Sequence, residues 1–171
     1  FPYTTLFRSA TARGVKLAVL TYDQHASVVF TAHQHPLTYL TTLPRKLTLL
    51  AEMGVDVVYV VNFTSALAKL APVDFVEQYM IGLHATAVVA GFDNTYGASD
   101  AHTDMSHLPG YAAGRFDVIE VSRVDVDGEE SASTRARQLV DAGQVDALNE
   151  LLTQPYQTSG VVVHGEARGR E

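Results

Sequence analysis

Residues 55–61 have the sequence Val-Asp-Val-Val-Tyr-Val-Val, a nearly continuous run of β-branched side chains. Such a run is typical of a parallel strand that is covered on both faces, whereas a strand with one face in water alternates apolar and polar residues. Gly54, directly before the run, is expected to end a helix in which Leu43, Leu47 and Leu50 share one face. A helix followed by a buried strand predicts the α/β class.

Similar apolar runs recur along the chain and alternate with helical patterns. Alternation with short connections is typical of a parallel sheet with helices on both faces. Further strands are expected over residues 16–22, 85–90, 116–121 and 160–163, and further helices end at Gly14 or cover 72–80, 134–142 and 145–152. The polar stretch 92–109 is longer than most connections in compact domains, and loops of that length are commonly functional.

Composition limits the classes of partner. The 171 residues carry a formal net charge of -7, which argues against nucleic acid or an anionic membrane surface, because both bind basic patches. No apolar run approaches the ~20 residues that cross a bilayer. The absence of cysteine excludes disulfides and thiolate metal sites. We expect a cytoplasmic protein whose partners are small molecules, and the oligomeric state stays open.

Polar and aromatic side chains follow three of the expected strands. In a parallel α/β sheet, ligands bind where the carboxyl ends of the strands meet. The candidates are Asp23 and His25, Asn62 and Phe63, and Asp93 and Tyr96. Position alone leaves plain alternatives open, in which Tyr96 anchors its loop, Phe63 belongs to the core and His25 hydrogen-bonds within its own loop.

A sharper candidate is the expected helix start at Ser133, Thr134 and Arg137. A capping hydroxyl, free backbone N–H groups and the positive end of the helix dipole together bind anions. Arg137, one turn into the helix, can add a bidentate contact to a phosphate. The alternative is an ordinary helix cap with solvated arginines.

Histidine pairs at His33 and His35 and at His102 and His107 have the spacing of metal ligands. A catalytic zinc site takes three protein ligands, and neither pair has a confident third beside it. No metal site is therefore predicted.

Several segments, taken in order, resemble the bifunctional riboflavin kinase/FAD synthetase family. Residues 132–137 (ASTRAR) are similar to its phosphate motif SSTxxR, and residues 21–26 (TYDQHA) to a T-F-D-P-H-P segment after a strand. Residues 91–97 (GFDNTYG) are similar to G-x-D-F-x-F-G. Further similarities are 143–148 (GQVDAL) to G-D-V-x-x-A, 151–156 (LLTQPY) to L-L-G-x-P-Y, and 160–170 (GVVVHGEARGR) to the first strand of the riboflavin kinase module.

The resemblance implies a Rossmann-like nucleotidyltransferase domain that transfers AMP from ATP to FMN, giving FAD and pyrophosphate, with Mg²⁺. It places Ser133, Thr134 and Arg137 at the triphosphate. Asp93 and Tyr96 would lie at the flavin or ribose, Asn62 and Phe63 would form pocket walls, and Asp23 and His25 would border the nucleotide cleft. The rival interpretation is a flavin- or nucleotide-binding regulatory module without catalysis.

The resemblance also implies a domain organisation. Residues 10–154 would be the FMN adenylyltransferase domain, and 155–171 the start of the riboflavin kinase module, cut short. Residues 1–9 look like a translated adaptor remnant. The family's H-x-G-H signature and the first strand that precedes it are expected upstream of residue 10, and neither is found. We therefore expect the chain alone to be inactive, although its full-length parent would also phosphorylate riboflavin to FMN.

Overall fold

The computed structural model describes residues 2–26, 39–91, 94–98, 103–122 and 132–165. It divides the chain into two compact units, which are described separately. The first comprises residues 1–38 and 43–126, and the second comprises 39–42 and 127–171. Both the parallel strands and the helices confirm the α/β class.

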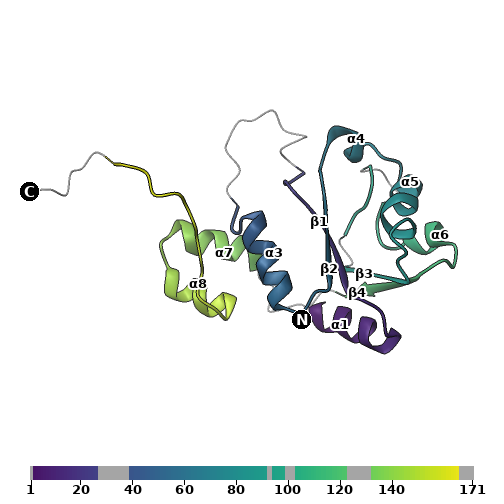
Figure 1. The fold of residues 1–171 in the computed structure, drawn as a ribbon, viewed down its shortest axis with the longest axis horizontal. Helices are drawn as coiled ribbons and strands as arrows, with labels where there is room; N and C mark the ends of the chain where they lie inside the picture. Colours follow the sequence, from purple (N-terminus) through teal and green to yellow (C-terminus); the bar gives the residue numbers. More distant parts are fainter. Residues whose placement is uncertain (1, 27–38, 92–93, 99–102, 123–131, 166–171) are drawn as a thin grey trace, which may run out of the picture. The chain divides into compact units, whose positions relative to one another are not determined.

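The first unit contains two pairs of parallel strands (Figure 1). Strand β1 (Ala18–Tyr22) pairs with β2 (Val57–Val61), with Ala18 opposite Val57. Strand β3 (Ala87–Gly91) pairs with β4 (Asp117–Val121), with Ala87 opposite Asp117. The expected single sheet is therefore not formed by the described residues, because no ladder of hydrogen bonds joins β1 to β3.

Helices follow the strands as the sequence predicts. Helix α3 (Leu43–Glu52) buries Leu50 and is followed by Gly54 at φ +86°, a left-handed conformation suited to glycine. Strand β2 begins two residues later than expected. Asp56 precedes the strand, and its carboxylate accepts a hydrogen bond from the Leu17 amide at 2.7 Å.

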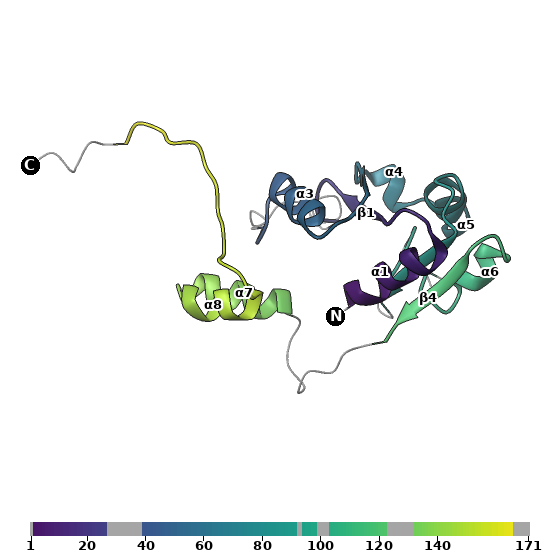
Figure 2. The ribbon, with the colours of Figure 1, turned by 60° about the horizontal axis from the view of Figure 1, so that its bottom comes forward.

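Helix α1 (Pro2–Arg13) begins well before the expected last turn at residue 10. It packs against β3 (Figure 2). Its last residue, Arg13, donates to the Asp117 carboxylate at 2.8 Å, at the start of β4. Residues 2–9 are thus part of a helix that packs on the strands, and their origin as an adaptor remnant stays a prediction.

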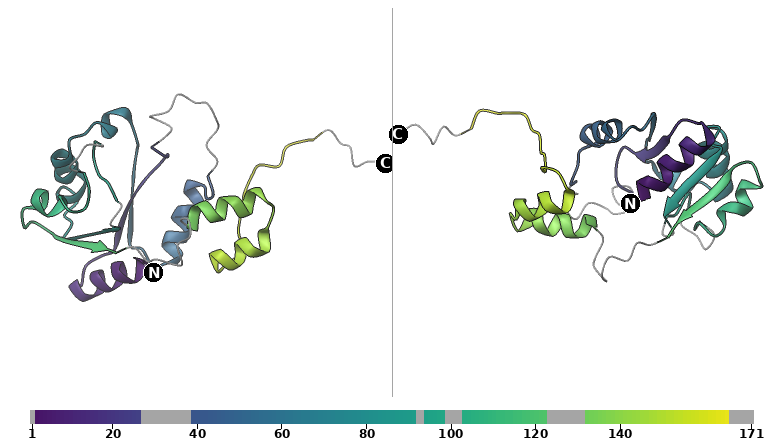
Figure 3. Two further views of the ribbon diagram at one scale, coloured as in Figure 1. Left: turned by 180° about the vertical axis from the view of Figure 1, so that it is seen from behind. Right: turned by 90° about the horizontal axis from the view of Figure 1, so that it is seen from below.

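The remaining helices of the first unit contribute residues to its core and lie together beside the strands (Figure 3). They are α4 (Ser65–Ala68), α5 (Pro72–Val76), the π-helical turn η1 (Glu77–Ile81) and α6 (Leu108–Ala112). The expected helix over 72–80 is therefore an α-helical turn followed by a wider one. The core contains Tyr96, Met105 and Leu108 from the stretch that was expected to be an irregular polar loop.

The second unit contains helices α7 (Ala132–Asp141) and α8 (Val145–Leu152). Its small core is formed by Ala136, Leu139 and Leu148. The Tyr156 hydroxyl donates to the Leu40 carbonyl at 3.0 Å. The predicted domain boundary after residue 154 stays a prediction.

The expected strand over residues 160–163 is not formed in the described structure. A strand needs a neighbouring strand to accept and donate its backbone hydrogen bonds, and no described strand pairs with this segment. Val161, Val162 and Val163 are 89%, 97% and 77% exposed.

Candidate functional site

The loops after β1 and β2 are joined by hydrogen bonds. The Asp23 amide donates to the Val61 carbonyl at 3.1 Å, and the Asp23 carboxylate accepts from the Phe63 amide at 2.9 Å. The Gln24 side chain donates to the Phe63 carbonyl at 2.7 Å. The Phe63 ring meets the Tyr22 ring edge-on, with centroids 5.1 Å apart. These contacts fix the carboxyl ends of the two strands together.

Three of the predicted residues here have exposed side chains, namely Asp23, His25 and Asn62. Phe63 is half-buried and packs against the core. The exposed side chains can reach a ligand. Phe63 packs against the core, which was one of the alternatives, and its role as a pocket wall stays a prediction. The hydrogen bond of Gln24 was not predicted, because glutamine side chains have no local pattern that identifies a cross-loop partner.

Tyr96 lies in a tightly held turn. Its amide donates to the Thr103 carbonyl at 3.1 Å, and the Ala98 amide donates to the Leu70 carbonyl at 2.7 Å. The Tyr96 ring is only 2% exposed and lies edge-on to Tyr111, with centroids 6.2 Å apart. Tyr96 therefore anchors its loop, and its role towards a flavin stays a prediction. Asp93 lies outside the described residues.

The Tyr96 hydroxyl is buried and finds no hydrogen-bond partner among the residues that the structure describes. Burial, together with the nearby Tyr111 and Asp104, raises the pKa of Tyr96 to about 12. The phenol is therefore neutral at physiological pH. A buried polar group without a partner carries a desolvation penalty in the folded state.

We expect Tyr96→Phe to leave the free energy of unfolding unchanged or to raise it by up to about 1–2 kcal/mol, because it removes an unpaired hydroxyl and keeps the ring. Urea unfolding measures the change. Tyr156→Phe is the matched control, and it should cost about 1 kcal/mol because that hydroxyl donates to Leu40. A clear loss of stability in Tyr96→Phe would contradict the absence of a partner.

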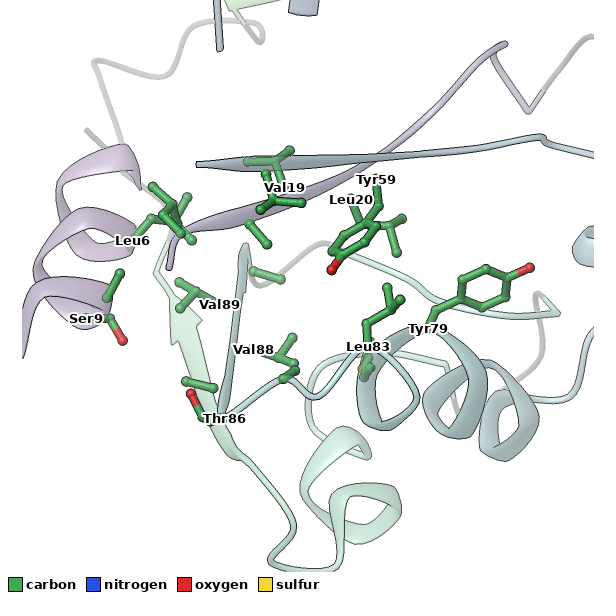
Figure 4. A pocket seen from close by; sticks show the side chains of 18 of the residues that line it. Leu6, Ser9, Val19, Leu20, Tyr59, Tyr79, Leu83, Thr86, Val88 and Val89 are labelled. Carbon is green, nitrogen blue, oxygen red and sulfur yellow. The ribbon is translucent and has the colours of Figure 1, made fainter. Parts of the chain in front are cut away.

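A hollow of about 720 Å³ lies between the two strand pairs, within the size range of small-molecule pockets. Figure 4 shows Val19 and Leu20 of β1 on one side, with Val88 and Val89 of β3 opposite them. Leu6 of α1 and residues of η1 complete the wall. Tyr96 also lines this hollow, whereas the other predicted site residues of the first unit that the structure describes do not.

The predicted phosphate-binding residues lie in the first turn of α7. The helix starts at Ala132, so Ser133 and Thr134 are its second and third residues and neither is the expected cap. Ala136 is buried, while Ser133, Thr134 and Arg137 have exposed side chains. They belong to the second unit, so their meeting with Tyr96 of the first unit stays a prediction.

One of the predicted histidines forms a defined cluster. Asp104 Oδ1 accepts hydrogen bonds from Ser106 Oγ at 2.6 Å, from the Ser106 amide at 3.0 Å and from His107 Nδ1 at 2.7 Å. No group of three potential metal ligands occurs among the described residues. His33, His35 and His102 lie outside that part of the chain.

The Asp104 cluster makes a prediction about pH. Hydrogen bonds from Ser106 and then from His107 lower the pKa of Asp104 to about 2, from an ordinary value of 3.8. A lowered pKa stabilises the fold above the ordinary value, and this contribution is lost as the pH falls towards 2. We expect carboxyl NMR titration to give the low value. As the pH falls from 3.8 to about 2, wild type should lose stability relative to Asp104→Asn. A carboxyl titration midpoint at the ordinary value would contradict the hydrogen bonds of this cluster.

No helix in the described part of the chain is long and apolar enough to cross a membrane. Comparison with known proteins identifies a family to which the chain is similar. A profile of the FAD synthetase family matches residues 3–135, which include most of the first unit together with Ser133 and Thr134 of α7.

Curated relatives carry the description bifunctional riboflavin kinase/FMN adenylyltransferase. The protein from Listeria monocytogenes is 41% identical over 158 residues, covering 92% of this chain and 50% of the relative. The protein from Bacillus subtilis is 36% identical, covering 94% of this chain and 51% of the relative. The Escherichia coli protein is 29% identical, with 92% and 50% covered. The chain spans about half the length of these relatives.

A solved structure shares the fold. A crystal structure described as a macrolide-efflux protein from Streptococcus pneumoniae has a TM-score of 0.83 and 29% sequence identity, covering 99% of this chain and 56% of that one. The described efflux role belongs to that protein. The similarity supports one arrangement of strands and helices in both chains.

Proposed function

This chain belongs to the FAD synthetase family, and from that membership we propose that its parent protein transfers AMP from ATP to FMN. In this reaction an oxygen of the FMN 5′-phosphate forms a bond to the α-phosphorus of ATP. The bond from the α-phosphorus to the bridging oxygen of pyrophosphate breaks, and FAD and pyrophosphate are the products. The family match is the observation that carries the proposal.

The chemistry of this transfer suits the residues present. The attacking phosphate oxygen is already an anion, so the protein needs neither a strong base nor a covalent intermediate. It must align two phosphates that repel each other and stabilise the charge that moves to the leaving pyrophosphate. Mg²⁺ would supply charge neutralisation between the phosphates when bound.

We assign the triphosphate to the first turn of α7. Ser133 and Thr134 offer hydroxyls there, beside amides that have no partner within the helix. Arg137 stands one turn further on and can contact a phosphate with two parallel hydrogen bonds. The exposed side chains of all three residues, next to the buried Ala136, support this assignment.

The acceptor would bind at the carboxyl ends of the strands. We propose Asp93 and Tyr96 for the flavin or ribose side, because they resemble the family motif at that point. Asn62 and Phe63 would form pocket walls, and Asp23 and His25 would border the nucleotide cleft. The hydrogen bonds from the Asp23 carboxylate and the Gln24 side chain to the Phe63 backbone support a pre-organised edge there.

We further propose that the complete sheet is Rossmann-like and has an additional parallel strand between β1 and β3, the strand expected first in the family's order. The two separate strand pairs and the apolar hollow between them support this proposal. Without that strand the carboxyl edge is incomplete. We therefore expect the 171-residue chain by itself not to form FAD.

For the parent protein we also propose phosphorylation of riboflavin to FMN, a cytoplasmic location, and small-molecule rather than nucleic-acid or membrane partners. The relatives' descriptions support the kinase activity. The formal net charge of -7 supports small-molecule partners, because nucleic acids and anionic membranes attract basic surfaces.

A direct assay tests the proposal. The parent protein is incubated with ATP, FMN and Mg²⁺, and FAD is separated from FMN and quantified by fluorescence. Formation of FAD with equimolar pyrophosphate supports adenylyl transfer. Binding of FMN and ATP without turnover would instead favour the regulatory module.

A further inference from the structure

The proposed adenylyl transfer brings two anions together, and each of them needs a positive partner. The triphosphate is assigned to the first turn of α7, where Arg137 supplies a positive charge. The acceptor is a phosphate monoester, which carries a charge of about -1.5 to -2 at neutral pH. None of the residues proposed at the acceptor edge is a lysine or an arginine. The 5′-phosphate of FMN therefore requires a basic side chain from another part of the first unit.

The stretch that leads from β1 into α3 is basic, although the chain as a whole is acidic. No aspartate or glutamate occurs from Gln24 to Ala51, and this stretch contains Arg45, Lys46 and three histidines. The formal net charge of the chain is -7. A local stretch without carboxylates keeps a positive potential within an acidic protein, and such a potential attracts a small anion.

Within this stretch, the Lys46 side chain lies at the carboxyl end of β1. Lys46 belongs to the first turn of α3, and its ammonium group donates to the Thr21 hydroxyl at 3.4 Å. Thr21 is the residue before the last in β1, and Asp23 of the following loop comes two positions later. Ligands of parallel α/β sheets bind at this end of the strands. The contact with Thr21 therefore keeps a positive charge next to the proposed acceptor edge.

The charge of Lys46 has no carboxylate partner among the described residues. Its ammonium group has three donors, and the recorded acceptor is the neutral hydroxyl of Thr21, at a distance that is long for a hydrogen bond. Lys46 is half-buried, so its charge has lost part of its hydration and is stabilised by an anion. The other basic side chains in the described part of the first unit are either paired with a carboxylate (Arg13, Arg45 and Arg115) or exposed (Arg8, Lys16 and Lys69).

We propose that the Lys46 ammonium group binds the 5′-phosphate of FMN, an inference that rests on the proposed function. Two of its donors would contact phosphate oxygens, while the hydrogen bond to Thr21 holds the side chain in place. This contact is present in the bound substrate as well as in the transition state. Its loss should therefore weaken the binding of FMN more than it slows the chemical step.

Lys46→Gln in the parent protein tests the proposal, because it removes the charge and keeps a donor for Thr21. We expect kcat/KM for FMN at saturating ATP to fall by about 10–100-fold, mainly through KM, as for a lost hydrogen bond to a charged group. The value of kcat/KM for ATP at saturating FMN should change by less than about threefold. Lys46→Met keeps the apolar stem and should show the same loss, whereas Lys46→Arg keeps the charge and should recover most of it.

Lumiflavin gives a measurement that a merely structural role of Lys46 would not explain. It has the flavin ring without the ribityl phosphate, so it should compete with FMN and inhibit wild type and Lys46→Gln with the same inhibition constant. Weaker inhibition of the variant would indicate a distorted pocket. Lys69→Gln is the matched control, because it removes an exposed lysine charge from the same unit, and it should change kcat/KM for FMN by no more than about threefold.

The outcomes separate this proposal from the proposed function. If wild type forms FAD and Lys46→Gln keeps its kcat/KM for FMN, the role of Lys46 is wrong and the adenylyl transfer stands. A loss that appears only in the parameters for ATP, a weaker inhibition by lumiflavin, or an equal loss in Lys69→Gln would also overturn the role of Lys46. A wild-type parent that forms no FAD would overturn the proposed function, and the role of Lys46 with it.

Discussion

Gly97→Ala is expected to reduce the free energy of unfolding by about 2–4 kcal/mol. Gly97 has φ +72°, a left-handed conformation that costs a residue with a Cβ atom roughly 1–2 kcal/mol. An added Cβ would also lie 2.9 Å from the Leu70 carbonyl oxygen and 3.1 Å from the Pro72 Cα. Both neighbours are backbone atoms that cannot rotate away, so the turn must move and weaken the hydrogen bond from Ala98 to Leu70.

Gly110→Ala is the matched control for this measurement. Gly110 lies inside α6 with an ordinary φ, and a Cβ there would meet no atom within 4 Å. Alanine in a helix is favoured over glycine, so this variant should be neutral or more stable by about 0.5–1 kcal/mol. Urea unfolding of the three proteins gives both values. Equal stability of Gly97→Ala and wild type would contradict the packing described for the Tyr96 turn.

Arg137→Ala is expected to lower kcat/KM for FAD formation by the parent protein by about 10²–10³-fold. The guanidinium would neutralise charge that develops on the leaving pyrophosphate, so its loss should lower kcat as well as weaken binding of ATP. Arg137→Lys should recover only part of the rate, because an ammonium cannot make the paired contact of a guanidinium. Steady-state kinetics at saturating FMN give both parameters.

The control for Arg137 is a neighbour on the same helix. Arg135 is also exposed, and its guanidinium donates to the Gln138 side chain at 3.4 Å. Arg135→Ala removes the same charge two residues away, and we expect a change in kcat/KM of no more than about threefold, as for a screened surface charge. Similar losses in both variants would indicate a general effect of charge and would contradict a specific contact at Arg137.

Local signals in the sequence predicted most of the elements. The β-branched run at 55–61 predicted β2. Gly54 and Gly143, both at positive φ, follow the ends of α3 and α7 as predicted. The α8 helix has its predicted bounds, Val145–Leu152. These features depend on neighbouring residues alone, through backbone preferences and the period of apolar side chains.

The sequence predicted which residues belong to the candidate site, but not how these residues contact one another. The carboxyl-end rule put Asp23 and Phe63 after two neighbouring strands, and the structure joins the two residues by a hydrogen bond, while their role at a ligand stays a prediction. It could not reveal that Gln24 bonds to Phe63, or that the Tyr96 hydroxyl is buried without a partner in the described structure. Those facts depend on atoms that are brought together by residues far apart in the chain.

The sequence by itself determined the α/β class, the order of helices and strands and the family-like motifs, because these are written in short-range patterns. Only the tertiary structure decided that β1–β2 and β3–β4 are separate pairs, that Met105 and Leu108 are core residues, and that an apolar hollow lies between the pairs. Strand pairing and burial depend on competition among segments that are distant in the sequence, for the same hydrogen bonds and the same apolar surface. A local sequence pattern does not determine which of these segments pair or become buried.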